Sequence, residues 1–198
     1  MNPSRRYAMA NRAAAAANTR SRILRALMDL STEKLTIDII LSEIATRAGV
    51  SVQTILRHFG NREDLFGAAV DFAAAEIVEE RSAPIDDVPA AVKVIVDHYE
   101  LRGDWVIAML GQELGDARIR RITELGRQTH RAWVETVFAP QLNPDERHHV
   151  DVDADLLVVA TDVYTWKLLR RDRGLDRDHT ERAMRRLVEA VLSSKPSS

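Results

Sequence analysis

The sequence predicts an all-α protein with a small N-terminal helix-turn-helix domain followed by a larger C-terminal helical bundle. Apolar residues recur at the three- and four-residue spacing of amphipathic helices, and no segment longer than a few residues alternates as a strand does. The 198 residues are 45% hydrophobic, which is ample for a buried core. We expect about nine helices, no internal repeat and no β-sheet.

Charge separates a basic beginning from an acidic remainder. Residues 1–62 hold ten Lys and Arg against four Asp and Glu, and residues 63–198 hold eighteen against twenty-six. Nucleic-acid affinity depends on neutralising phosphates, so this pattern is typical of a DNA-binding domain joined to something else. Chance segregation of surface charge is the alternative.

Several classes of protein are disfavoured. The chain has no cysteine, which excludes disulfides, thiolate metal sites and cysteine nucleophiles, and fits a reducing compartment. No apolar run approaches the roughly 20 residues that span a bilayer, and the first residues lack the apolar core of a signal peptide. We therefore expect a cytoplasmic protein without a membrane partner.

Residues 1–18 contain Arg5, Arg6 and Arg12 around an alanine run. We interpret them as a mobile basic arm that is a solvated tail, with contact of its arginines to DNA phosphates or a minor groove as the alternative. From Thr19 an apolar stripe predicts a helix that packs behind the next two.

Residues 40–59, ILSEIATRAGVSVQTILRHF, predict a helix, a tight turn and a second helix. Ala45 is small enough for two helices to cross, Gly49 permits the turn, and Ile55 locks the second helix. Ser51 stands where it can cap that helix. The spacing is typical of a DNA-reading motif, although a tight pair of helices with a glycine cap would look similar.

The outer face of the second helix would enter the major groove if Ile55 and Phe59 face inward. On that face an amide can pair with adenine, apolar groups can contact thymine methyls, and basic groups can contact phosphates. The predicted DNA-binding residues are Ser42, Ser51, Val52, Gln53, Thr54, Leu56, Arg57, His58 and Arg62, of which Arg57, His58 and Arg62 are assigned mainly to phosphates.

Helical patterns continue to the end of the chain. A helix from Arg62 to about Arg81 is long enough to join two domains, and its first turn is acidic, as the helix dipole favours. After a proline-containing linker at residues 82–90, we expect helices over residues 88–102, 104–114, 116–138, 147–171 and 178–192, with Gly103 as an interruption.

The segments TRSRILRALMDL and SEIATRAGVSVQTILRHFGNREDLFGAAV, within residues 19–72, are similar to the N-terminal domain of the tetracycline repressor (TetR) family. The resemblance implies a helix-turn-helix domain at residues 19–66 and a ligand-binding and dimerisation domain at residues 67–198. It also implies a transcriptional regulator, here interpreted as a repressor that a small-molecule effector releases from double-stranded operator DNA.

Two departures from the family pattern remove polar contacts to DNA. Leu56 stands where members usually carry an aromatic residue, and Ile39 and Ile40 stand where they usually carry threonines. A helical interaction protein whose helix-turn-helix no longer binds DNA is therefore the alternative. Salt-dependent DNA binding separates the two.

The resemblance also implies an effector pocket and a dimer interface in the second half. Aromatic and methionine side chains with a few polar groups suit a pocket, although such a set is often plain core. The candidate pocket residues are Trp105, Met109, Gln112, His130, Trp133, Val134 and Tyr164. The last two helices would pair with those of a second copy in a homodimer, with ordinary intramolecular packing as the alternative.

An enzyme is not expected. Glu146 and His149 form one Glu-x-x-His pair, whereas a di-iron bundle needs a second pair and two more glutamates. The sequence contains no glycine-rich phosphate loop and no nucleophile elbow. We expect no catalytic residue, no metal and no cofactor.

Overall fold

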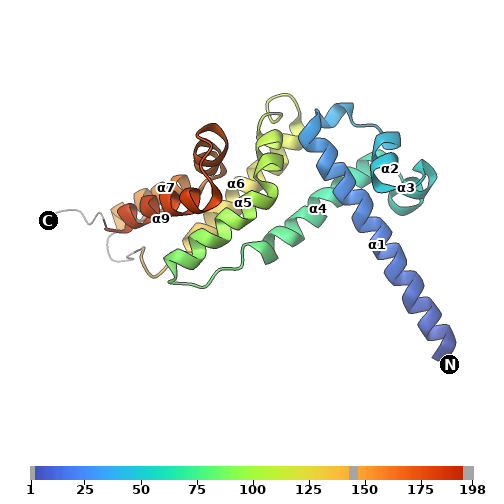
Figure 1. The fold of residues 1–198 in the computed structure, drawn as a ribbon, viewed down its shortest axis with the longest axis horizontal. Coiled ribbons are helices and arrows are strands. Elements are labelled where there is room, and N and C mark those ends of the chain that lie inside the picture. The colour runs from blue at the N-terminus through green and yellow to red at the C-terminus, as the bar shows by residue number, and fades with distance from the viewer. Residues whose placement is uncertain (1–2, 143–146, 194–198) are drawn as a thin grey trace. The chain divides into compact units, whose positions relative to one another are not determined.

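A computed structural model describes residues 3–142 and 147–193, and their fold is all-α, as predicted, with no strand among them (Figure 1). The helices are α1 Pro3–Glu33, α2 Leu41–Ala48, α3 Val52–Phe59, α4 Arg62–Glu80, α5 Val88–Leu110, α6 Ala117–Val137, α7 Arg147–Thr161, α8 Val163–Lys167 and α9 Arg177–Ser193. A 3₁₀ turn at Thr36–Asp38 precedes α2, and a π-helical turn at Leu168–Asp172 follows α8.

The chain divides into two compact units, Met1–Glu76 and Ile77–Ser198. α4 runs through the boundary. The first unit extends beyond the expected limit at residue 66 because Phe66 and Ala69 of α4 are buried in its core. DNA binding by residues 19–66 and ligand binding and dimerisation by residues 67–198 stay predictions.

α1 begins earlier than the sequence pattern suggests. We expected an arm at residues 1–18 and a helix from Thr19, whereas the helix starts at Pro3 and its first half projects beyond the other helices of its unit (Figure 1). The reason is helix propensity, because alanine is the best helix former and residues 13–17 are all alanine. Proline is tolerated in a first turn. DNA contact by residues 1–18 stays a prediction.

The core of the first unit explains the helix-turn-helix. Gly49 adopts the left-handed conformation (φ 65°) that ends α2, and the backbone N–H of Thr54 donates to Ser51 Oγ at 3.1 Å to cap α3. At the N-terminus of α2, Glu43 Oε2 accepts the N–H of Ile40 at 3.1 Å. Apolar side chains from four helices fill the centre, among them Ile23, Leu24, Leu27, Ile44, Ala45, Ile55, Phe59 and Leu65.

Gly103 does not interrupt a helix, contrary to expectation. α5 runs through it, and a Cβ atom built on Gly103 would lie 2.4 Å from Trp166 Cζ3. The glycine therefore permits the close approach of α8 to α5. The expected helix over residues 147–171 is broken instead at Asp162, whose carboxylate accepts the N–H of Tyr164 at 2.8 Å and starts α8.

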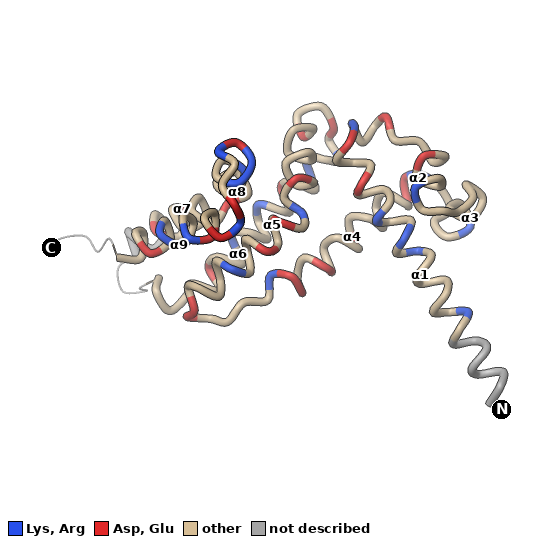
Figure 2. Tube along the Cα trace, in the orientation of Figure 1, with Lys and Arg blue, Asp and Glu red and all other residues tan. Residues whose placement is uncertain are grey.

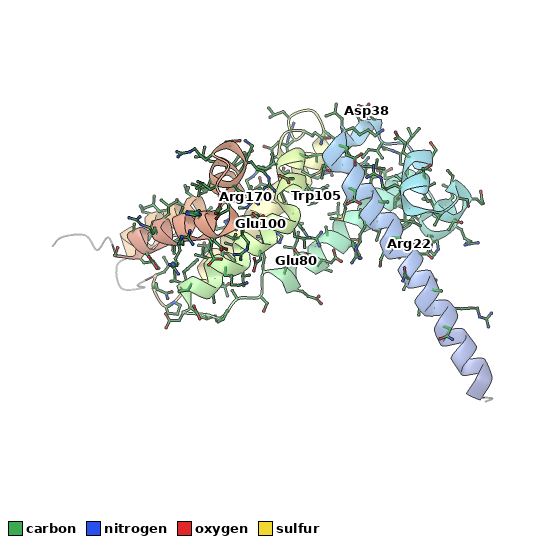
Figure 3. All side chains as sticks on the ribbon, viewed as in Figure 1. Arg22, Asp38, Glu80, Glu100, Trp105 and Arg170 are labelled. Atoms are coloured by element: carbon green, nitrogen blue, oxygen red, sulfur yellow. The ribbon has the colours of Figure 1, made fainter. Side chains whose placement is uncertain are left out.

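Salt bridges fasten the segment after α8 to α5, within the second unit. Figure 2 shows basic residues on the turn after α8, and Figure 3 shows Arg170 beside Glu100. Arg170 Nε lies 2.9 Å from Glu100 Oε1, and Arg171 Nε lies 2.9 Å from Asp104 Oδ1. Glu100 Oε1 also accepts the indole N–H of Trp166 at 3.0 Å. These contacts fix the buried tryptophan against Gly103.

Candidate nucleic-acid interface and effector region

α3 presents a polar face on an apolar base. Ile55 and Phe59 are buried, as predicted, while Gln53 and Arg57 are exposed and lie four residues apart on one face. Neither makes a hydrogen bond or ion pair with the described part of the chain, so both are available to a partner. The remaining predicted α3 residues Val52, Thr54, Leu56 and His58 are half-buried, and Ser51 is exposed at the cap.

Arg20 of α1 supports the end of α3, a role that the sequence analysis missed. Its guanidinium lies 4.4 Å from the centroid of the Phe59 ring, and Nη1 donates to the carbonyl oxygen of His58 at 3.3 Å. The signal for this contact is tertiary, because nothing near Arg20 in the sequence points to α3. Arg20 therefore helps to hold the orientation of the candidate reading helix.

Arg62 is engaged inside the first unit. Its guanidinium donates to the carbonyl oxygens of Thr36 at 2.9 Å and Ile39 at 3.3 Å, and it lies 4.3 Å from the centroid of the Phe66 ring. It thus holds the segment that leads into α2. Its predicted phosphate contact stays a prediction, which these hydrogen bonds do not favour.

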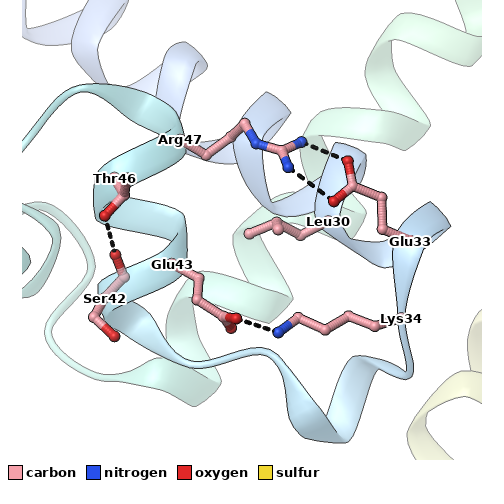
Figure 4. A pocket seen from close by; sticks show the side chains of 7 residues that line it. All are labelled: Leu30, Glu33, Lys34, Ser42, Glu43, Thr46 and Arg47. Atoms are coloured by element: carbon pink, nitrogen blue, oxygen red, sulfur yellow. Dashed lines mark hydrogen bonds and ion pairs between the residues drawn. The ribbon is translucent and has the colours of Figure 1, made fainter.

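An open hollow of about 550 Å³ lies between the end of α1 and α2, and it contains the predicted site residue Ser42 (Figure 4). Both guanidinium Nη atoms of Arg47 donate to Glu33 at 2.8 Å, and Lys34 pairs with Glu43. The hydrogen bond from Arg47 lowers the pKa of Glu33, so this carboxylate stays charged. The charged side chains that line the hollow already form ion pairs with one another, and these ion pairs attach α2 to the end of α1 and the residue after it.

The candidate pocket residues are only partly brought together. His130, Trp133 and Val134 share α6, where His130 and Val134 are buried. Met109 is buried and Trp105 is half-buried on α5 (Figure 3), and Gln112 donates to the carbonyl oxygen of Ala108 at 2.9 Å just beyond it. Tyr164 is 56% exposed on α8, because Asp162 starts a new helix and turns this residue outward.

Buried polar groups surround the end of α4 in the second unit. Glu80 accepts from His98 Nδ1 at 2.8 Å and from Arg102 Nη2 at 2.6 Å, while the carbonyl oxygen of Arg81 accepts from Trp133 Nε1 at 2.9 Å. Burial, together with the positive charge of Arg81, lowers the pKa of His98 to about 3 and that of His130 to about 4. Both imidazoles are therefore neutral at pH 7.

Metal ligands do not cluster among the described side chains: no group of three or more His, Cys, Asp or Glu is placed to hold a metal ion there. Glu146 and the side chain of His149 lie outside the described part of the chain. Within the described part of the chain, no helix is long and apolar enough to cross a membrane.

Comparison with known families matches residues 40–69, which include the helix-turn-helix, to the family model for bacterial regulatory proteins of the tetR family. These residues include all nine of the predicted DNA-binding residues. Among curated protein sequences, none matches this chain.

Solved structures share the fold over most of the chain. A transcriptional regulator from Rhodococcus sp. is 18% identical, covers 90% of this chain and 98% of its own, and has a TM-score of 0.67. A regulator of the TerR/AcrR family from Aquifex aeolicus is 15% identical over 87% of this chain and 99% of its own, with a TM-score of 0.65.

A tetR-family transcriptional regulator from Streptomyces coelicolor is also similar. It is 16% identical, covers 90% of both chains and has a TM-score of 0.63. The likeness extends through both compact units, whereas the family match is confined to the first half of the chain. The chain thus carries the helix-turn-helix of the tetR family of bacterial regulatory proteins and has the fold of TetR-like transcriptional regulators.

Proposed function

We propose that this protein is a homodimeric, ligand-controlled transcriptional repressor that binds operator DNA through α3. The observation that carries the proposal is the polar face of α3 inside a segment that matches the tetR family. Gln53 and Arg57 are exposed there, while buried Ile55 and Phe59 and the Ser51 cap fix the helix. An amide and a guanidinium so placed suit an adenine edge and a phosphate.

Dimerisation would use α7 and α9. These helices pack on each other and leave apolar side chains exposed: Val152, Leu156 and Val159 on α7 and Leu187 on α9. One helix-turn-helix reads few base pairs, so a two-fold dimer that presents two copies of α3 would gain specificity from paired half-sites. Sedimentation of the full chain, compared with a Leu156→Glu/Val159→Glu variant, tests this surface. A monomeric wild type would contradict it.

Effector control would act through α4. This helix begins at Arg62, which holds the segment before α2, and ends at Glu80 in the buried polar cluster of the second unit. An effector that prefers one position of α4 would shift the population of DNA-binding dimers. A preference of about 1–3 kcal/mol would change operator affinity roughly 5- to 150-fold.

One observation favours the alternative of an interaction protein. The exposed residues around the start of α2 include Leu35, Ile37 and Ile40. Apolar side chains form no hydrogen bond or ion pair with DNA phosphates, whereas an exposed apolar patch suits a protein partner. Ile39, in contrast, is fully buried, so its departure from the family pattern is explained by the core and not by lost DNA binding.

Fluorescence anisotropy separates the two functions. The full chain is titrated into DNA from around its own gene and into random DNA, at several salt concentrations. A repressor prefers a particular sequence and loses affinity as salt rises. If the neighbouring DNA shows no preference, selection from random DNA follows, and failure there, with a folded dimer confirmed, would favour the interaction protein.

A further inference from the structure

Arg81, the residue after α4, keeps an unpaired charge in the second unit. Its guanidinium lies 5.8 Å from the centroid of the Tyr99 ring, and its Nε is buried without a hydrogen-bond partner. No carboxylate of the described residues forms an ion pair with it, whereas Arg102 nearby pairs with Glu80 at 2.6 Å. The charge of Arg81 acts on the carboxylate of Asp162 only at longer range, where it opposes the rise in pKa that burial causes. A partly buried cation with no carboxylate in direct contact is unfavourable, so the site is suited to an incoming anion.

Side chains from three further helices close a ring with Arg81. Tyr99 of α5 donates from its hydroxyl to the carbonyl oxygen of Thr161 at 3.1 Å, and Thr161 Oγ1 lies 3.2 Å from His130 Nε2. The His130 ring stacks on Trp133 of α6, with centroids 5.9 Å apart. The indole N–H of Trp133 donates to the carbonyl oxygen of Arg81, which closes the ring. α4, α5, α6 and α7 thus meet at one buried polar site.

His98 and His130 each keep an unpartnered nitrogen beside this ring. They are 2% and 5% exposed, and His98 Nε2 and His130 Nδ1 have no hydrogen-bond partner. The other nitrogen of each ring faces an acceptor, the Glu80 carboxylate for His98 and the Val158 carbonyl oxygen for His130. That nitrogen therefore carries the hydrogen, and the unpartnered one presents a lone pair that accepts a donor.

We propose that the effector is a small organic acid that also carries an O–H or N–H donor, an inference that rests on the ligand-controlled regulator proposed above. Its carboxylate binds the Arg81 guanidinium, and its donor group is accepted by His130 Nδ1. The chemistry follows from what is left unpaired, which is one buried cationic donor and two buried lone pairs. Tyr99 and Trp133 contribute aromatic side chains to the same ring of residues, which suits an acid with an aromatic body.

Arg81 also explains how such an acid would act on DNA binding. The residue follows the last residue of α4, and Glu80 before it is held by His98 and Arg102. A carboxylate that draws the Arg81 side chain away from Tyr99 would change the contacts of the residue that follows α4, and so the position of the end of that helix. The same helix starts at Arg62, whose hydrogen bonds position the segment before α2.

Calorimetry of the full chain tests the ligand class. The probes are benzoate, its three hydroxy isomers and the corresponding neutral amides. We expect a hydroxybenzoate to bind most tightly, and its amide to bind roughly tenfold or more weakly because the charged hydrogen bond is lost. Arg81→Gln should weaken acid binding by a similar factor, Arg81→Lys by less, and the exposed Arg186→Gln should leave it unchanged.

Three outcomes would overturn the assignment: no acid binds, amides bind as well as acids, or Arg81→Gln binds acids as the wild type does. Circular dichroism of each variant confirms that it is folded. Operator binding is measured on the same samples. Sequence-specific DNA binding without acid binding removes only the ligand class, whereas acid binding without any DNA binding removes the repressor function.

Discussion

Two buried histidines should make the second unit sensitive to mild acid. The folded chain keeps His98 neutral to about pH 3 and His130 neutral to about pH 4, because burial and the charge of Arg81 lower both pKa values. In the unfolded chain each imidazole takes up a proton below its ordinary pKa of 6.5. The unfolded state therefore binds more protons than the folded state. The contribution of the two histidines to the free energy of unfolding is complete above pH 6.5 and decreases as the pH is lowered.

The magnitude follows from the width of that pH window. Each histidine contributes about 1.4 kcal/mol per pH unit, so between pH 6.5 and 5.0 each removes roughly 2 kcal/mol and the pair roughly 4 kcal/mol. Glu80 does not contribute in this range, because its pKa is lowered by its hydrogen bonds to Arg102 and His98, which outweigh its desolvation. Asp162, whose pKa is raised by burial, acts in the opposite direction, so the sum is an upper bound.

Urea unfolding at pH 7.0 and 5.0, at one protein concentration, measures the difference. His98→Asn and His130→Gln place an amide nitrogen near the ring nitrogen that donates in each case, and each should remove about half of the difference. His179→Gln is the control, because that side chain is exposed near the start of α9. A wild-type difference below about 1 kcal/mol, or a full difference in both variants, would refute the assignment of two neutral buried imidazoles.

Other predictions concern packing and DNA contact. Gly103→Ala should destabilise the protein by about 1–3 kcal/mol in thermal unfolding, because the new Cβ meets Trp166, whereas Gly126→Ala, with open space around it, should stabilise by about 0.5–1 kcal/mol. Gln53→Ala should relax base preference at one operator position by about 1–3 kcal/mol in anisotropy titrations. Arg57→Ala should weaken all sequences alike and reduce the salt slope by about 0.9; equal behaviour of these two variants would reject the division of roles. Arg62→Ala should lower the melting temperature as well as DNA affinity, since it frees the carbonyls of Thr36 and Ile39; loss of affinity with no change in stability would return it to a phosphate role.

The helix-turn-helix could be predicted because its determinants are local. Ala45, Gly49, Ser51 and Ile55 lie within eleven consecutive residues, and each has the role its spacing implies. The buried state of Ile39 could not be read in this way, since it depends on packing against α1 and α4 in the first unit's core.

The second unit was harder to predict because its determinants are distant in the sequence. Gly103 looks like a helix break until Trp166 is placed against it, and Tyr164 looks like a pocket residue until Asp162 starts a new helix. His130 and Trp133 are candidate pocket residues because of their residue types alone. Their partner Arg81 was not, because a single arginine at the end of a helix carries no pattern that distinguishes it from a surface residue.

The position of Arg81 gives the proposed regulation its physical basis. A ligand can shift an equilibrium only by its differential affinity for two states, so an effector must change a contact that α4 makes in only one of them. Glu80 is already satisfied by His98 and Arg102, and moving it would break its hydrogen bonds to both side chains. The Arg81 guanidinium, in contrast, forms no ion pair with a carboxylate of the described residues and lies over the ring of Tyr99. A carboxylate can therefore bind this side chain without breaking an ion pair, and in the proposed regulation it would do so next to the last residue of α4, the helix that follows α3.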